Sequence, residues 1–378
     1  MFWNWGYLFM KRINWTNTLF LILTPIIAIT GTITLIALHL LSWKTVVLML
    51  SLMFVTGLSV TAGYHRLFSH NSYKAAWPVR LVLLLFGAAA FEGSVLEWST
   101  DHRNHHRYTD TEKDPYNIKQ GFWYAHIGWL FTLDISKRDF SNVEDLKKDP
   151  LVRFQHRFFI PIAIFMAFVL PMLIASLWGN ILGGLFVAGF LRVVLTQHST
   201  FCINSVCHVF GKQFYSQRTT ARDHWLTAIF TLGEGYHNFH HQFPIDYRNG
   251  IRFYQFDPTK WLIRALSFLG LAHDLKTVQA HRITHYRIDM EHGRLSELTK
   301  QTHQNLQQLY QSILQTLSKI DESEKARKNL KASKVDYLLD RMNEYKNNMK
   351  NYCHQIKAAK SDLKYLLKSW KNTVNELS

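Results

Sequence analysis

The chain has 378 residues, and lysine and arginine outnumber the acidic residues to give a net charge of +16. Its three cysteines, Cys202, Cys207 and Cys353, form no C-x-x-C motif, which excludes a disulfide-stapled secreted domain and favours a reducing compartment. Apolar runs of membrane-spanning length accompany the basic residues, so the charge indicates a cytoplasmic membrane face and not nucleic-acid binding.

Four apolar stretches predict membrane-spanning helices that form two hairpins: 18–41, 46–61, 158–178 and 181–198. Lys11 and Arg12 precede the first hairpin and Arg66 follows it, which places both of its ends in the cytoplasm. The second hairpin returns the chain to the same side, so both termini are expected there. The first stretch is too long for a signal peptide and lacks an A-x-A site, so no cleaved leader is expected.

A fifth apolar stretch, residues 79–96, is predicted not to cross the membrane, although hydropathy alone favours a span. A crossing here would put the histidines before it and the histidines after it on opposite faces. We therefore expect this stretch to lie along the membrane or inside the cytoplasmic body.

Eight histidines gather in three clusters: His65 and His70; His102, His105 and His106; and His237, His240 and His241. The second and third clusters repeat the pattern H-x-x-H-H, which puts three imidazoles on one helix face. His208, four residues after Asn204 beyond the last span, is a ninth candidate ligand. Eight or nine imidazoles exceed the ligands of a single ion and therefore predict a dinuclear site.

The kind of metal stays open from ligand type, because imidazole binds zinc, copper, iron and nickel alike. The scattered cysteines exclude a closed Cys-rich zinc site. Two irons held mainly by neutral histidine would be strongly oxidising and would suit oxygen activation for attack on an unactivated C–H bond.

The last part of the chain is predicted to form long helices, because no glycine or proline follows Gly293. A heptad seam runs through Val335, Leu338, Met342, Tyr345, Met349, Tyr352, Ile356, Ala359, Leu363, Leu366 and Trp370. A shorter seam, out of register with the first, comprises Leu306, Leu309, Ile313 and Ile320. An antiparallel hairpin, a self-associating coiled coil and a tail that covers the rest of the protein all fit. We expect a membrane domain over 1–290 and a helical extension over 294–378.

The histidine clusters resemble, in order and spacing, the three histidine boxes of the membrane fatty-acid desaturases, most of all the stearoyl-CoA (delta-9) branch. The stretches that carry the resemblance are Gly63–His70, Glu97–His106 and Gly233–His241, supported by Asp114-Pro115, Gly121–Trp123, His126–Trp129, Asn204-Ser205 and Asp246–Gly250. It covers roughly residues 15 to 270. The implied fold is an all-α integral membrane protein with four spans and a cytoplasmic helical cap that holds two metals.

The resemblance implies an enzyme that uses two irons, O₂ and two supplied electrons to place a cis double bond in a long acyl chain. The eight box histidines and His208 would be the ligands, and Asn204 would hold a water on one iron. By analogy, one iron would take His65, His70, His102, His106 and His241. The other would take His105, His208, His237 and His240.

Further residues are expected around the metals. A metal-bound imidazole usually donates its second N–H to a carboxylate or carbonyl, and Asp101, Asp223 and Glu234 are candidate acceptors near the boxes. In the family, a bent tunnel measures position along the acyl chain by depth. The residues that match its lining are Trp98, Thr196 and Phe201.

Some positions depart from the family pattern. Leu133 and Asp134 stand where the animal acyl-CoA enzymes carry a basic pair, so the acyl carrier stays open between CoA, a carrier protein and a membrane lipid. His224 replaces the usual asparagine, without a functional explanation. A fused haem-binding segment is missing, so the expected electron donor is separate, either a ferredoxin or a small haem cytochrome with its reductase.

Two other functions fit parts of the pattern. A di-iron hydroxylase of fatty acids or alkanes shares the histidine boxes and differs in the step after the first C–H cleavage. A histidine-rich metal transporter would place its ligands near the middle of the membrane, not beyond the ends of the spans.

Overall fold

The computed structural model describes residues 13–298, 303–332 and 342–377, which form two compact units. The first unit runs to Thr277 without residues 214–216, and the second comprises those three residues and the chain from Val278 onward. The expected domain boundary at 290–294 falls inside a helix of the second unit. Lys11 and Arg12, on which part of the predicted orientation rests, lie outside the described residues, as do Val335 and Leu338.

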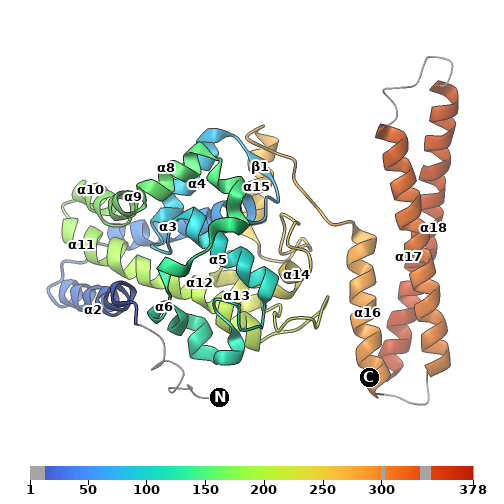
Figure 1. The fold of residues 1–378 in the computed structure, drawn as a ribbon, viewed down its shortest axis with the longest axis horizontal. Coiled ribbons are helices and arrows are strands. Elements are labelled where there is room, and N and C mark those ends of the chain that lie inside the picture. Colours follow the sequence, from blue (N-terminus) through green and yellow to red (C-terminus); the bar gives the residue numbers. More distant parts are fainter. Residues whose placement is uncertain (1–12, 299–302, 333–341, 378) are drawn as a thin grey trace. The chain divides into compact units, whose positions relative to one another are not determined.

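The four predicted spans are confirmed as helices long and apolar enough to cross a membrane: Trp15–Ala37, Trp43–Ser69, Phe159–Ser176 and Ile181–Val209. Two of them, the second and the fourth, extend well past the predicted ends at 61 and 198. The reason is that the backbone stays helical after the sequence becomes polar, and these extensions carry candidate metal ligands. In Figure 1 the four spans form one side of the first unit.

Several spans consist of more than one helical segment. The first is α2 (Trp15–Ala37), and the second joins α3 (Trp43–Leu58) to the π-helix η1 (Ser59–Ser69). The third comprises α9 (Phe159–Ile164), η6 (Phe165–Val169) and α10 (Leu170–Ser176), and the fourth α11 (Ile181–Leu185), η7 (Phe186–Leu191) and α12 (Arg192–Val209). α2 and α3 pack against η7 through a core of Leu35, Met49, Val187 and Ala188.

The fifth apolar stretch does not form a span-length helix, in agreement with the prediction. Its helix α4 (Trp77–Ala88) has 12 residues, about 18 Å of rise, well short of a ~30 Å hydrocarbon core. A turn with Phe91 and Gly93 at positive φ ends it. The helix α5 (Val95–Tyr108) then begins at a capping box, in which Ser94 and Glu97 exchange hydrogen bonds.

Arg192 is fully buried at the centre of the fourth span and connects it to three other segments. Its guanidinium donates to the carbonyl oxygens of Ala188 (2.9 Å), Ala89 (3.3 Å) and Ala167 (3.3 Å), and to the hydroxyl of Thr56 (3.2 Å). The charge is thus solvated by backbone dipoles from α4, the third span and its own helix, and by a hydroxyl of the second span.

The remaining elements of the first unit are short and form the cap around the histidines. They are β1 (Lys74–Ala75), η2 (Ile118–Gln120), η3 (Tyr124–Gly128), α6 (Trp129–Phe131), η4 (Ile135–Lys137), η5 (Phe140–Val143), α7 (Glu144–Lys147), α8 (Pro150–Arg157), α13 (Trp225–Phe230), α14 (His237–Gln242), α15 (Pro258–Phe268) and β2 (Ala272–His273). β1 and β2 pair antiparallel, with Lys74 opposite His273, and so tie the last part of this unit to the end of the second span.

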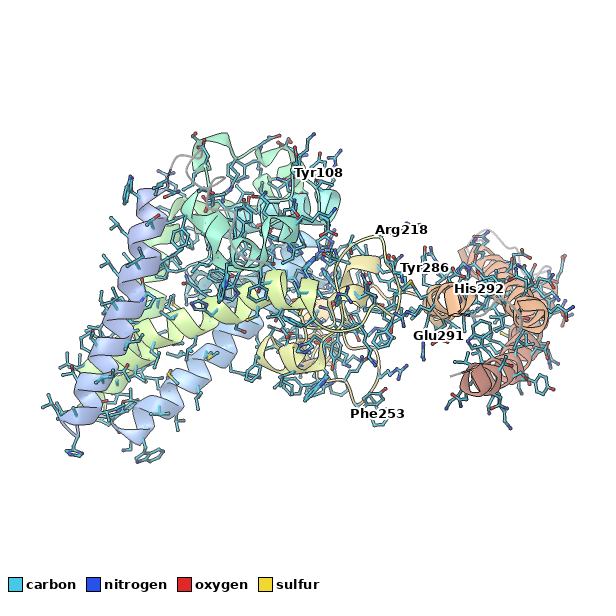
Figure 2. The ribbon with its side chains drawn as sticks, turned by 90° about the horizontal axis from the view of Figure 1, so that it is seen from below. Tyr108, Arg218, Phe253, Tyr286, Glu291 and His292 are labelled. Carbon is cyan, nitrogen blue, oxygen red and sulfur yellow. The ribbon has the colours of Figure 1, made fainter. Side chains whose placement is uncertain are left out.

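The second unit is a bundle of three helices, α16 (Ala280–Leu298), α17 (His303–Ala332) and α18 (Met342–Leu377). α17 and α18 are antiparallel neighbours (Figure 1), since Lys360 reaches Glu324 while Trp370 packs with Ile313. Figure 2 labels Glu291 and His292 on α16; Glu291 accepts a hydrogen bond from Trp370, and His292 stacks on Tyr310 with ring centroids 4.0 Å apart.

The predicted heptad seam of α18 faces the interior of this bundle. Tyr345, Ile356 and Trp370 are buried, and the other described seam positions from Met349 to Leu366 are half-buried. The antiparallel hairpin is therefore the arrangement within one chain, and it uses the seam internally.

Candidate metal centre

The nine candidate histidines converge from four segments into two groups. The first group comprises His65, His70, His102, His106 and His240, and the second His105, His208, His237 and His241. In each group the ligand nitrogens lie within 4.8 Å of one another. Two metal positions are therefore available, one with five and one with four imidazoles.

The π-helix η1 brings His65 and His70 together. In an α-helix, residues five apart would point about 140° away from each other. Here the backbone N–H of His70 donates to the carbonyl of His65 (3.1 Å), the i→i+5 bond of a π-helix. The two rings consequently lie side by side, with centroids 4.8 Å apart.

The two H-x-x-H-H helices divide their ligands in the same way. In α5, His102 and His106 belong to the first group and His105 to the second. In α14, His237 and His241 share the second group, whereas His240 belongs to the first. In both helices, the first and last histidines of the H-x-x-H-H motif (i and i+4) thus share one group, and the middle histidine (i+3) belongs to the other group.

This division corrects the partition implied by the family resemblance, which exchanged His240 and His241. The Nε2 atom of His240 lies 2.9 Å from the Nε2 atoms of both His65 and His106, and that of His241 lies 3.2 Å from His105. The repeated H-x-x-H-H spacing was a signal for this grouping, since one rule serves both helices.

His208 and Asn204 lie on the extension of α12 beyond the apolar part of the fourth span. The Nε2 atom of His208 lies 3.1 Å from that of His237, within the second group. Asn204, one turn earlier, lines the cavity described below together with His237.

The orientation of the rings fits metal ligation. The Nδ1 atom of His105 lies 2.9 Å from Asp114, that of His65 lies 2.8 Å from Glu234, and that of His208 lies 2.7 Å from the hydroxyl of Thr220. A ring that donates its Nδ1–H outward presents the lone pair of Nε2 inward, as metal-bound histidines do.

Burial keeps five of the candidate ligand rings neutral. It lowers the pKa values of His102, His106, His237, His240 and His241 well below the usual value, and the neighbouring histidines lower them further. Neutral imidazole is the form that binds a metal ion. The donor set therefore fits two transition-metal ions.

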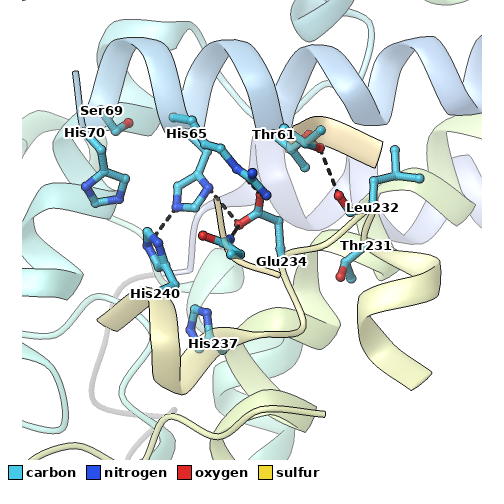
Figure 3. A network of polar contacts seen from close by, with 12 residues as sticks. Thr61, His65, Ser69, His70, Thr231, Leu232, Glu234, His237 and His240 are labelled. Carbon is cyan, nitrogen blue, oxygen red and sulfur yellow. Dashed lines mark hydrogen bonds and ion pairs between the residues drawn. The ribbon is translucent and has the colours of Figure 1, made fainter. Parts of the chain in front are cut away.

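Glu234 belongs to a buried ion cluster next to His65 (Figure 3). Arg66 donates to Glu234 (2.9 Å), to Asp257 (3.2 Å) and to the carbonyl of Tyr247 (2.7 Å). Burial alone would raise the pKa of Glu234, but His65 and Arg66 lower it to about 2. Glu234 is therefore a carboxylate that can accept the Nδ1–H of His65.

The other two carboxylates expected beside the histidines have different partners. Asp101 pairs with Arg138 at 2.7 Å and not with a histidine. Asp223 instead accepts the backbone N–H groups of Asn238 (2.8 Å) and Phe239 (3.0 Å) at the start of α14. Burial raises the pKa of Asp223 to about 7.

Two histidine partners escaped the sequence prediction. Asp114 accepts a hydrogen bond from His105, and Thr220 contacts His208 while its hydroxyl donates to Asp110. Thr220 and His208 are 12 residues apart with a loop between them, so no helical spacing could connect them.

We expect Asp223 to stabilise the start of α14. Replacing Asp223 with alanine removes the acceptor of two backbone N–H groups and should cost about 1–2 kcal/mol, whereas Asp223→Asn, which keeps an acceptor oxygen, should cost less than about 0.5 kcal/mol. Thermal unfolding of the purified protein measures the difference. Equal losses in the two variants would show that these hydrogen bonds are not the source of the stability.

An apolar cavity of about 720 Å³ leads to the histidines. Its lining includes Trp98, Thr196 and Phe201, the three predicted tunnel residues, and the candidate ligands His65, His102 and His237. Trp98 stacks on His102 with ring centroids 4.8 Å apart and donates to Glu92 (3.2 Å), a cavity residue that lies outside the histidine motifs. The cavity can thus bring an apolar chain against the ligands of the first group.

The comparisons with known proteins agree with this geometry. Residues 41–274 match the family model described as fatty acid desaturase. A probable acyl-CoA desaturase of Schizosaccharomyces pombe is 49% identical over 282 residues, 74% of this chain and 57% of that protein. Acyl-CoA desaturase 1 of Saccharomyces cerevisiae is 49% identical over 245 residues, 64% of this chain and 48% of that protein.

An animal protein is also similar: stearoyl-CoA desaturase 5 of Bos taurus is 42% identical over 228 residues, 59% of this chain and 68% of that protein. The chain spans only about half the length of the two fungal relatives.

Proposed function

The chain belongs to the fatty acid desaturase family, and we propose that it is an integral membrane acyl desaturase that forms a cis double bond, at the delta-9 position, in a long saturated acyl chain. The observation that carries the proposal is the pair of histidine groups at the wall of an apolar cavity. The proposed cofactor is a pair of irons, which would activate O₂. We propose His65, His70, His102, His106 and His240 as the ligands of one iron and His105, His208, His237 and His241 as those of the other.

The protein itself would bind and orient the chain. Trp98 lies flat against His102, so an acyl chain that passes Trp98 is held next to the first group. Thr196 and Phe201 line the cavity from α12 and would fix the depth of the chain. Asn204 would hold a water near the second group. Exclusion of bulk water by the apolar lining would protect the oxidant from side reactions.

The reaction needs a separate supply of electrons. Reduction of O₂ to two waters takes four electrons, and the acyl chain gives up only two when its C–C bond becomes double. We propose that a ferredoxin or a small haem cytochrome with its reductase provides the other two. We propose acyl-CoA as the substrate, since the relatives named above are acyl-CoA and stearoyl-CoA desaturases and Arg157 lines the cavity.

We further propose that the active site and both termini are cytoplasmic. The second and fourth spans carry His65 and His208 near their last residues, Ser69 and Val209. Ligands at span ends favour a catalytic cap at the membrane surface over a transport pathway, which would place them at mid-membrane.

Fatty-acid profiling of a desaturase-deficient host tests the function. Expression of the chain should produce monounsaturated acyl chains with a cis double bond, and derivatisation of the lipids locates that bond. Hydroxylated chains without new unsaturation would identify a hydroxylase and refute the desaturase assignment. A double bond at another position would refute only the delta-9 assignment.

Thr196 should act on the substrate without affecting the metals. Thr196→Met would fill part of the cavity and should lower desaturation of an 18-carbon chain by roughly tenfold with unchanged iron content. Its matched control is Leu195→Met, because Leu195 is 40% exposed on the same helix. Activity and iron are measured on the same preparation, and a parallel loss of both would contradict a role confined to the substrate.

A further inference from the structure

The exposed surface of α18 carries a row of lysines that the proposed desaturase activity does not use. The row, called here the lysine stripe, comprises Lys346, Lys350, Lys357, Lys360, Lys364, Lys368 and Lys371, all exposed. At 3.6 residues per turn, these seven positions fall within about 80° of arc. Over 25 residues at 1.5 Å each, the stripe is about 37 Å long.

The stripe is separate from the packed face of the bundle and from the acidic residues of its helix. The axis of the stripe lies about 110° around α18 from the buried seam of Tyr345, Ile356 and Trp370. Glu344 and Asp362, both exposed, lie about 160° away from it. The positive charge is therefore concentrated along one outer edge of the bundle.

Most of this charge is not neutralised by the part of the chain that the structure describes. Lys360 lies 3.4 Å from Glu324 of α17. Within the described ranges, no carboxylate lies within 4.0 Å of the other six lysines. Six like charges along one helix repel one another, so a polyanionic partner that neutralises them would gain free energy.

We propose that the lysine stripe binds the anionic surface of a lipid bilayer. A row of four to eight lysines on a helix matches the electrostatic recognition of acidic lipid headgroups, worth about 1 kcal/mol per residue near the surface. From Val278 onward the bundle follows the unit with the four candidate membrane spans in the same chain, so the chain tethers it to a membrane protein. The long, straight geometry of the stripe suits a flat surface.

A protein partner fits the stripe less well. Protein interfaces are depleted in lysine and enriched in aromatic residues and arginine, which serve as buried anchors. The arc of the stripe contains seven lysines together with Cys353 and Asn375, and among its described residues there is no aromatic side chain and no arginine. Delocalised attraction without an anchor is typical of lipid headgroups.

Vesicle binding by the full chain tests the proposal. The protein is reconstituted in phosphatidylcholine nanodiscs and incubated with separate vesicles of phosphatidylcholine alone or with 30% phosphatidylserine. Flotation should show at least tenfold tighter binding to the acidic vesicles, and this preference should disappear in 0.5 M NaCl, where charges are screened beyond about 4 Å. Equal binding to both vesicles, or binding that resists salt, would overturn the proposal without any variant.

A matched pair of variants assigns the effect to the stripe. Replacing Lys350, Lys357, Lys364 and Lys368 with glutamine should weaken binding to acidic vesicles by roughly 100-fold. The control replaces Lys319, Lys325, Lys328 and Lys331, four exposed lysines distributed around α17, and should weaken binding less than about fivefold. Glutamine preserves helix propensity, and circular dichroism verifies that both variants keep their helices.

The pair also separates the alternatives. Equal weakening by the two sets of substitutions would show that total charge, not the stripe, governs binding. A purified acidic electron carrier is tested in the same way. If this carrier binds the chain but not the stripe variant, and the chain shows no preference for acidic vesicles, the stripe recognises a protein and the bilayer assignment is wrong.

Discussion

Replacing His240 with alanine is expected to abolish desaturation and to remove iron from the protein. Its Nε2 atom lies 2.9 Å from those of His65 and His106, and its helix also carries His237 and His241 of the other group. Loss of a residue that merely supports a ligand reduces metal affinity or activity 10–100-fold, so loss of a ligand should cost at least ~100-fold. Lipid profiling and elemental analysis of the purified variant measure the two effects.

The control is His273→Ala, which removes an exposed histidine of β2 from the same unit. It should leave iron and activity unchanged. His105 is the i+3 residue of α5 and belongs to the second group. His105→Ala should therefore also abolish desaturation and remove iron. A His240 variant that retained full iron and normal unsaturation would refute the two-group assignment.

Replacing Arg66 with methionine should destabilise the protein by about 3–5 kcal/mol. Arg66 is fully buried and is the shared partner of Glu234 and Asp257, so its removal leaves two buried carboxylates without the charge that compensates them. Since Glu234 contacts His65, metal binding should weaken together with stability. Thermal unfolding in detergent, with and without added Fe²⁺, measures both.

The matched control is Arg153→Met on α8, where an exposed arginine donates to the carbonyl oxygens of Lys147 and Lys148. This change should cost less than about 1 kcal/mol. An Arg66 variant as stable as this control would mean that the buried carboxylates find other partners. A double variant that also neutralises the cluster, Arg66→Met with Glu234→Gln, should recover part of the lost stability.

The sequence predicted the parts of this architecture that depend on local spacing. The four spans followed from hydropathy, and two histidine triplets followed from the i, i+3, i+4 geometry of a helix. The exclusion of residues 79–96 as a span followed from the histidines as well, and the 12-residue helix α4 agrees with it. The spans and the triplets are each encoded within fewer than about 30 consecutive residues, whereas the exclusion of 79–96 needed the histidines on both of its sides.

Features that depend on distant contacts or on unusual backbone geometry were not predictable. The π-helix that aligns His65 with His70 leaves no distinctive composition. Arg66 meets Glu234 and Asp257 across more than 160 residues. Asp101 was expected beside a histidine because it is adjacent in sequence, yet Arg138, 37 residues away, is its partner. Proximity along the chain is a poor guide to hydrogen-bond partners once a cap of short segments folds.

Arg192 has a consequence for biogenesis. A lone arginine at the centre of a membrane helix costs about 2.5–3.5 kcal/mol on insertion, so the segment Ile181–Val209 enters the bilayer with a penalty of its own. One acceptor, Ala188, belongs to the fourth span itself, and the others belong to the second span, to Ala89 at the end of α4 and to the third span, all of which are synthesised earlier. The fourth helix should therefore become stable only after the preceding ones have assembled, and His208, which it carries, is the last part of the cap to be anchored from the membrane side. Arg192 thus makes the stability of the fourth span depend on the segments that precede it.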